Sequence, residues 1–390
     1  MKLKISLISS FLHESDNFTL ENNKFIKAIE NRIQTKFEIV PLDDYDCDLK
    51  LIFIESGGSE GIFLEAFKNL QAPYYLLTSG ANNSLAASLE ILTYLNNNHL
   101  KGEVIHGSLD YSSKRILNLA NNENLEQKRL GVVGKPSDWL ISSIPEYKEI
   151  KNKFNYELVD IPISLLEQYY NEVKISDFNQ NIKLDFNEEE LKKAKKVYVA
   201  IKKIKNEFKL DGLTIRCFDL LSSIKSTSCL ALGLLNKEGI IGTCEGDIMS
   251  MVTMELIKSI TGQSSFQCNP SIIDVQNNEI VLAHCTVPFD MLEKYHLLTH
   301  FESNSGVAIK GFLKKDDVTI VRISSNLKDY FISEGKIVEN LEESNLCRTQ
   351  IKIKMDDVSS LLTKPCGNHH IVVYGKHKDK LKQVLDKLLK

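Results

Sequence analysis

Short apolar runs rich in β-branched residues alternate with amphipathic segments through the first two thirds of the chain. The runs typical of buried strands include 2–9, 51–54 and 74–77. The segments with helical spacing that lie between and after them include 24–37, 61–70 and 84–98. Because strands that alternate with helices form parallel sheets with helices on both faces, this pattern predicts an α/β fold.

The alternation restarts after a polar spacer at 121–127, and the texture changes beyond Gly262. In the middle third, a charged helix is expected at 187–194, and strands are expected at 129–133, 156–161, 196–201 and 212–218. Strand-like runs then follow one another, with little helix before a Lys-rich segment at 379–390; they lie at 272–275, 279–285, 306–313, 317–324, 336–341, 347–355 and 370–375. We therefore predict two α/β domains and a β-rich C-terminal domain with a terminal helix, at 1–126, 127–262 and 263–390.

Composition argues against several classes of function. The formal net charge is -4, with Lys and Arg spread along the chain, which gives no reason to expect a nucleic-acid-binding surface. No stretch approaches the roughly 20 apolar residues that a membrane span requires. Eight cysteines without CxxC pairing favour reduced thiols over a disulfide framework. We expect a cytoplasmic protein that binds a small molecule rather than nucleic acid or a membrane.

The densest cluster of candidate functional residues is GIIGTCEGD at 239–247, followed by a helical-looking stretch at 248–260. A strand that runs into glycines and then a helix places Glu245 and Asp247 at the carboxyl end of a sheet, where ligands commonly bind open α/β folds. Two carboxylates there can bind a divalent cation or act as an acid–base pair. For Asp247, capping of the following helix is an equally good explanation.

Two adjacent histidines, His369 and His370, precede the strand-like run that ends at Gly375. Neighbouring strand residues face opposite sides, so only one imidazole can readily point into a given site. Neutral imidazole is a good ligand for Mn, Zn or Fe cations. A histidine pair before a strand is more often structural, and only a site shared with Glu245 would favour function.

Strand ends supply further candidates. Asp274 precedes a turn-prone segment and His284 ends an apolar run, so a turn aspartate and a buried core histidine are the alternative interpretations. Asp219 closes another apolar run, and Lys225 nearby could offset negative charge or contact a hydroxyl group.

Two polar loops in the N-terminal third follow predicted strands and precede helices, at 55–61 and 78–84. Such loops present backbone N–H groups and hydroxyls that suit phosphate or sugar hydroxyls. Neither loop is a GxGxxG or Walker motif, so nucleotide binding is not supported. The chain also has no HExxH or protein-kinase motif.

Four segments occur in an order that resembles the L-fucose/L-arabinose isomerase superfamily, and the shorter fucose isomerase-like proteins most of all. They are GTCEGD, ITGQSSFQCNPSIID, VLAHCTVP and CGNHHIVVYG, within 211–375. The resemblance implies two Rossmann-like domains and a β-barrel-like C-terminal domain, assembled as a homotrimer or homohexamer. It also implies interconversion of aldoses and ketoses with a divalent metal, typically Mn²⁺.

The resemblance assigns roles to individual residues. Glu245 matches a glutamate that binds metal and transfers protons, and His369 matches a metal-binding histidine, or His370 if the register shifts by one. Asn269 falls where the fucose enzymes have a second acidic ligand. Asp274 could supply that carboxylate through a local shift, and Asp219 lies one residue from a glutamate of the arabinose enzymes.

The predicted function is metal-assisted isomerisation of a free sugar or a sugar derivative through an enediol. A separate possibility is metal-dependent chemistry on a sulfonated, phosphorylated or acidic sugar derivative. The residues expected to contact the sugar are Asn269, His284, Lys225, Ser79 and Asn83, together with the N-terminal loops at 13–14 and 56–60. The alternative is a sugar-binding or regulatory homologue without activity. Asn269 in place of an acidic ligand favours that alternative.

Overall fold

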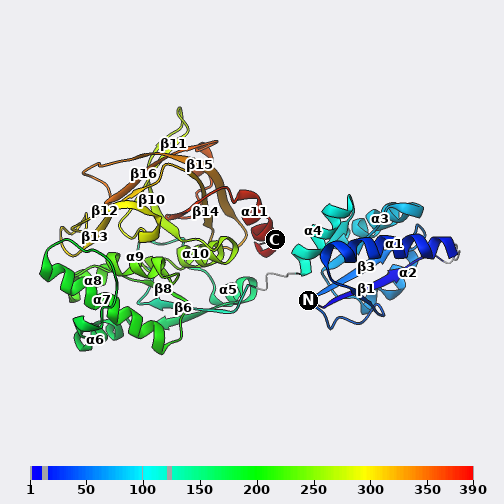
Figure 1. Ribbon diagram of the computed structural model, residues 1–390, viewed down its shortest axis with the longest axis horizontal. Coiled ribbons are helices and arrows are strands. Elements are labelled where there is room, and N and C mark those ends of the chain that lie inside the picture. Colours follow the sequence, from blue (N-terminus) through cyan, green and yellow to red (C-terminus); the bar gives the residue numbers. More distant parts are fainter. Residues whose placement is uncertain (1, 11–15, 99, 121–124, 390) are drawn as a thin grey trace. The chain divides into compact units, whose positions relative to one another are not determined.

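The computed structural model describes residues 2–10, 16–98, 100–120 and 125–389, and the predicted sugar contacts at 13–14 lie outside them. The chain forms two compact units, Met1–Asn124 and Leu125–Lys390 (Figure 1). Among the described residues, no helix is both long and apolar enough to cross a membrane. Each unit is described by itself below.

The first unit is a five-stranded parallel sheet with the strand order β2-β1-β3-β4-β5. Its strands are β1 (Leu3–Ile8), β2 (Phe37–Ile39), β3 (Leu49–Ile54), β4 (Tyr74–Leu77) and β5 (Gly102–Ile105). Alternate residues of β3 point to opposite faces, so Leu51 and Phe53 pack with one core and Ile52 and Ile54 with another. Helices α1 (Asp16–Ile33) and α4 (Leu109–Ala120) cover the first face, and α2 (Glu60–Ala66) and α3 (Ser84–Asn97) cover the second.

The second unit begins with a four-stranded parallel sheet of order β7-β6-β8-β9. Its strands are β6 (Lys128–Val133), β7 (Tyr156–Ile161), β8 (Gly212–Ile215) and β9 (Ile241–Cys244). One face packs against α5 (Tyr147–Phe154) and α10 (Ile248–Thr261). The other packs against α6 (Ile163–Glu172), α7 (Glu188–Glu207) and α9 (Cys229–Lys237), while the short helix α8 (Phe218–Ser223) follows β8.

A closed six-stranded barrel follows, with the order β10-β11-β16-β15-β14-β17. Its strands are β10 (Ser265–Asp274), β11 (Glu279–His284), β14 (Asp317–Ile323), β15 (Tyr330–Asn340), β16 (Thr349–Met355) and β17 (His370–Tyr374). A separate hairpin consists of β12 (Leu292–Leu298) and β13 (Ala308–Leu313), and α11 (Lys378–Leu389) is the terminal helix. Helix α10 contacts β8 and β9 of the sheet as well as β10, β14 and β17 of the barrel, so the two layers share one hydrophobic core (Figure 1).

The predicted fold class is confirmed: two parallel-sheet α/β regions precede a barrel with a terminal helix. The boundaries at 126 and 262 stay a prediction. The strand expected at 196–201 is wrong, because this run belongs to the long helix α7. Its buried residues Val197, Ile201 and Ile204 recur at helical spacing, and this packing overrides their β-branched preference. The strand expected at 212–218 is too long, since β8 ends at Ile215.

Candidate metal centre

Glu245 lies in a tight turn directly after β9. It has a positive φ of 65°, and Gly246 follows with a φ of 68°. A Cβ on Gly246 would lie 2.5 Å from the carbonyl oxygen of Lys135, and Ser137 N donates to the carbonyl oxygen of Glu245 at 2.9 Å. The loop after β6 therefore clamps this turn, which matches the tendency of strained backbone to occur at functional sites.

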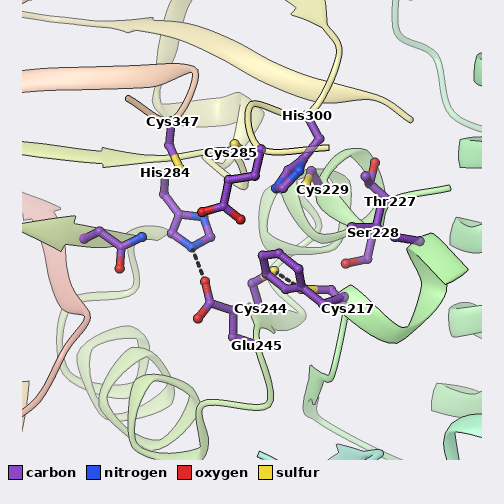
Figure 2. Close-up of a pocket in the computed structure, with 14 residues that line it drawn as sticks. Cys217, Thr227, Ser228, Cys229, Cys244, Glu245, His284, Cys285, His300 and Cys347 are labelled. Carbon is purple, nitrogen blue, oxygen red and sulfur yellow. Dashed lines mark hydrogen bonds and ion pairs between the residues drawn. The ribbon is translucent and has the colours of Figure 1, made fainter. Parts of the chain in front are cut away.

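Two imidazoles from the barrel face the Glu245 carboxylate. His284 ends β11, and its Nε2 lies 3.7 Å from Glu245 Oε1, as the dashed line in Figure 2 marks. His369 directly precedes β17, and its Nε2 lies 3.5 Å from the same oxygen. The two rings meet edge to face with centroids 5.3 Å apart. Glu245 and His369 are 124 residues apart in the chain, and the fold brings their side chains together at one site.

The other ring nitrogen of each histidine is held by a protein side chain. Nδ1 of His369 contacts Asp247 Oδ2 at 2.8 Å, and Nδ1 of His284 contacts Thr286 Oγ1 at 3.0 Å. The Nε2 atom of His369 is buried and has no hydrogen-bond partner. Because a carboxylate on Nδ1 favours the tautomer with a free Nε2 lone pair, this arrangement is typical of a metal-binding histidine.

Asp247 has two functions in the fold. Its carboxylate caps α10 by accepting from Ser250 N at 2.9 Å, so the capping interpretation is confirmed. The same carboxylate pairs with Arg322 Nη1 at 3.0 Å, and both side chains are fully buried. Asp247 therefore links the helix, the barrel and His369, and it orients the imidazole rather than facing the pocket.

The charged groups of the site shift one another's pKa values. Burial alone would raise the pKa of Glu245, but the interactions with His284 and His369 lower the pKa well below its usual range. Burial alone would likewise lower the pKa of His369, whereas Asp247 and Glu245 raise it to about 9. In both cases the interactions with oppositely charged groups outweigh desolvation. Glu245 is therefore held ionised and His369 holds a second proton in the metal-free site, and a cation that binds Nε2 would displace that proton.

Glu245, His284 and His369 could together hold a metal ion. Each offers one ligand atom, these atoms lie within 4.8 Å of one another, and all three residues are buried. In the part of the chain that the structure describes, no other group of three or more His, Cys, Asp or Glu residues meets this condition. Two imidazole nitrogens and one carboxylate oxygen suit Mn, Fe or Zn cations, and the unpartnered Nε2 of His369 fits such an ion.

A pocket opens beside this group and has an empty volume of about 460 Å³, including space open to solvent. Its lining residues come from α8, the start of α9, β9 and the turn after it, β10, the end of β11, the connection between β12 and β13, and the segment before β16 (Figure 2). They include the polar side chains Thr227, Ser228, Asn269, His300 and Glu302 and the ring of Phe218. Glu245 and Glu302 are the two carboxylates among the lining residues.

The structure brings together some of the sequence-predicted residues. Glu245 and His369 share one cluster, and Asn269 lines the pocket beside them. His284, predicted as a sugar contact with a core histidine as the alternative, also lies in the cluster and offers a ligand atom. His370 faces elsewhere: its ring packs against Phe331, and burial lowers its pKa to about 4.

Other predicted residues lie away from the cluster. Asp274 is the last residue of β10, and its carboxylate accepts hydrogen bonds from the backbone and side chain of Asn277 in the following turn, as the turn interpretation expected. Asp219 does not end a strand: it is in the first turn of α8 and pairs with Arg216 at 3.1 Å. The described structure brings neither carboxylate to Glu245.

The remaining predicted sugar contacts are not tested. Lys225 is exposed in the connection between α8 and α9, and it does not line the pocket. Ser79 and Asn83 lie in the first unit, beside the turn that precedes α3. Their contact with a sugar stays a prediction.

Three functional candidates were missed from the sequence: Thr286, Glu302 and Trp139. The spacing of His284 and Thr286, two residues apart, could have indicated that one orients the other. Trp139 could have been noticed as the single tryptophan of the chain.

The chain is similar to curated proteins named sulfoquinovose isomerase. It is 24% identical to that of Priestia aryabhattai over 273 residues, which are 64% of this chain and 60% of the relative. The same values hold for the protein of Priestia megaterium. For that of Alkalicoccus urumqiensis the identity is 22% over 156 residues, 38% of this chain and 35% of the relative. The chain thus spans about 60% of the length of the first two relatives, and no family model matches it.

Proposed function

We propose that this protein is a metal-dependent aldose–ketose isomerase that acts on a sugar or a sugar derivative. The observation that carries the proposal is the buried group of Glu245, His284 and His369, in which Nε2 of His369 has no hydrogen-bond partner. The similarity to proteins named sulfoquinovose isomerase supports the reaction type. Assembly as a homotrimer or homohexamer is part of the proposal and rests on the superfamily resemblance alone.

A divalent cation of the Mn²⁺ type would be held by Glu245 Oε1 and by Nε2 of His284 and His369. When bound, it supplies stabilisation of negative charge on the two sugar oxygens between which the carbonyl group moves. Asp247 and Thr286 hold the two imidazoles in the orientation that this binding needs. Both of these Nδ1 contacts are buried.

We assign proton transfer between C1 and C2 to Glu302. It is the carboxylate of the pocket wall that lies outside the proposed ligand set, and it is exposed enough to exchange protons with solvent. In this proposal Glu302 supplies the second carboxylate of the site, which Asn269 cannot supply because its side chain is an amide. Thr227, Ser228 and Asn269 offer hydroxyl and amide groups for the sugar hydroxyls.

The proposal is tested with a panel of aldoses and ketoses, including sulfoquinovose and its uncharged parent D-glucose, in D₂O with Mn²⁺ or after removal of metal by chelation. We expect at least one sugar to exchange its C2 proton for deuterium, by NMR, in the Mn²⁺ sample alone. Product analysis by chromatography covers a hydride shift, which would convert the sugar without exchange. If no sugar shows either exchange or conversion with Mn²⁺, the proposed isomerase activity is contradicted.

Two variants separate the proposed roles. Glu302→Gln is expected to lower kcat by about 100-fold or more, because it removes a proton-transfer group, and to leave Mn²⁺ affinity unchanged. Asn269→Ala, on the same pocket wall, is expected to raise KM while kcat changes little. If Glu302→Gln retains full kcat, proton transfer belongs to another group.

The second candidate function is sugar binding without turnover, which the amide of Asn269 at the position of an acidic ligand favours. It predicts that Glu245→Gln still binds a sugar in calorimetry and that the unmodified protein converts none. A Mn²⁺-dependent turnover of any sugar in the panel rules this function out.

A further inference from the structure

Trp139 is the single tryptophan of the chain, and it lies in the loop between β6 and α5. Its indole Nε1 donates a hydrogen bond of 2.6 Å to Glu245 Oε2. The residue is 50% exposed, although tryptophan is usually buried more deeply. A half-exposed tryptophan with a short bond to the central carboxylate is not explained by core packing alone.

The two oxygens of Glu245 have different surroundings. Oε1 faces the Nε2 atoms of His284 and His369, whereas Oε2 accepts from the indole. Rotation of the carboxylate to exchange the two oxygens would break the hydrogen bond from the indole. The bond from Trp139 therefore fixes Oε1 as the oxygen that faces the imidazoles.

The indole itself is held in place from two sides. Its ring packs edge to face on Phe218 with centroids 5.0 Å apart, and Phe218 packs in the same way on His300 at 5.6 Å. On the other side, the backbone of the same loop clamps the Glu245 turn through Ser137 N and the carbonyl of Lys135. The loop thus positions both the backbone and the side chain of Glu245.

We propose that Trp139 is a positioning residue that commits Oε1 of Glu245 to the cation by holding Oε2. This inference rests on the metal-binding part of the proposed function. It predicts that removing the indole N–H weakens metal binding even when the shape of the ring is kept. Contacts that orient a metal ligand typically contribute about 10–100-fold to metal affinity.

The test uses the full chain and replaces the N–H without changing the ring. Because Trp139 is the only tryptophan, residue-specific incorporation of the isostere β-(3-benzothienyl)alanine in place of tryptophan changes this position alone. Mn²⁺ affinity is measured from the electron paramagnetic resonance signal of the free ion. We expect the isostere protein to bind Mn²⁺ about 10–100-fold more weakly than the unmodified protein, with an unchanged thermal unfolding midpoint.

Two further proteins serve as controls. Trp139→Phe, which also lacks the N–H, should weaken Mn²⁺ binding at least as much as the isostere. Ile141→Ser changes an 87% exposed residue of the same loop and should leave the affinity within about twofold. In the unmodified protein, Mn²⁺ should quench the tryptophan fluorescence with the same midpoint as the resonance titration.

The outcomes separate this inference from the proposed function. Equal Mn²⁺ affinity in the unmodified and isostere proteins overturns the role of Trp139 and leaves the metal site intact. Weak binding in Trp139→Phe with full affinity in the isostere assigns the effect to the ring and also overturns it. An unmodified protein that binds no Mn²⁺ overturns both the inference and the metal-binding part of the proposed function.

Discussion

Glu55 in the first unit and Glu245 in the second occupy similar positions in their sheets. Glu55 directly follows β3, and Glu245 directly follows β9. Both side chains are buried, with exposures of 9% and 8%. Their pKa values nevertheless move in opposite directions: burial raises that of Glu55, whereas the interactions with two imidazoles outweigh burial and lower that of Glu245.

The difference comes from what packs above the sheet edge. Glu55 meets an uncharged partner, the Asn22 side chain, whose Nδ2 donates to Oε1 at 3.1 Å. Glu245 meets His284 and His369, which the barrel supplies. A parallel sheet therefore provides the carboxylate in both units, but the second layer decides whether that carboxylate is a candidate ligand.

The largest expected effect is that of Glu245→Gln. Loss of the carboxylate should weaken Mn²⁺ binding by more than about 100-fold and reduce any isomerase activity to background, because the two imidazoles are left without an anionic ligand. Glu55→Gln is the matched control, and its Mn²⁺ affinity should stay within about twofold of the unmodified protein. Metal analysis after gel filtration and Mn²⁺ titration measure both. Comparable losses of Mn²⁺ affinity in the two variants would contradict the claim that Glu245, and not Glu55, is a metal ligand.

Asp247→Asn should have the next largest effect. Its neutral amide no longer fixes the His369 tautomer, so we expect Mn²⁺ affinity to fall about 10–100-fold. It also leaves Arg322 buried without its counter-charge, which should lower the free energy of unfolding by about 3 kcal/mol. Calorimetric titration and denaturant unfolding check the two effects separately. Unchanged values in both would show that Asp247 does not support the site.

The smallest expected effect is a pH-dependent gain in stability from Glu55→Gln. The folded-state pKa of Glu55 is raised above 4.5, so ionisation at higher pH opposes folding, and this cost is absent below pH 4.5. Glu55→Gln should therefore unfold at higher denaturant concentration than the unmodified protein at pH 7, with the difference shrinking as the pH falls towards 4.5.

Glu245→Gln should behave in the opposite way in metal-free protein. The pKa of Glu245 is lowered on folding, so its contribution to stability is present above pH 4.5 and is lost as the pH falls. Urea unfolding curves of both variants and the unmodified protein between pH 4 and 7 make the comparison. If the stability difference from the unmodified protein changes with pH in the same direction for both variants, the opposite pKa shifts of Glu55 and Glu245 are contradicted.

Much of the fold could be predicted from local patterns. The expected strands at 74–77 and 156–161 have the bounds of β4 and β7, because short apolar runs rich in aromatic or β-branched residues and bounded by turns have few alternatives. The strand prediction for 196–201 is wrong because the packing of one face of α7 overrides the local β-strand preference of this run. Glu245 and His369 could be proposed because glycine-rich and strand-end positions mark them in the sequence.

The rest of the site depends on contacts that no local pattern contains. Whether His284 is a core histidine or a ligand depends on a carboxylate 39 positions away, and the barrel closure that joins them is visible only in three dimensions. Trp139 contacts Glu245 across 106 positions for the same reason. Asp274 lies five positions beyond Asn269, at the end of β10, where its carboxylate bonds to Asn277 of the following turn.

The central claim is that Glu245, His284 and His369 bind one divalent cation, and anomalous diffraction tests it most directly. Crystals of the full chain grown with Mn²⁺ should show a peak in the anomalous difference map at the manganese absorption edge, bonded to Glu245 Oε1 and to Nε2 of both histidines. Saturating Mn²⁺ without a peak between these three atoms, or with the peak at another set of residues, would contradict the account.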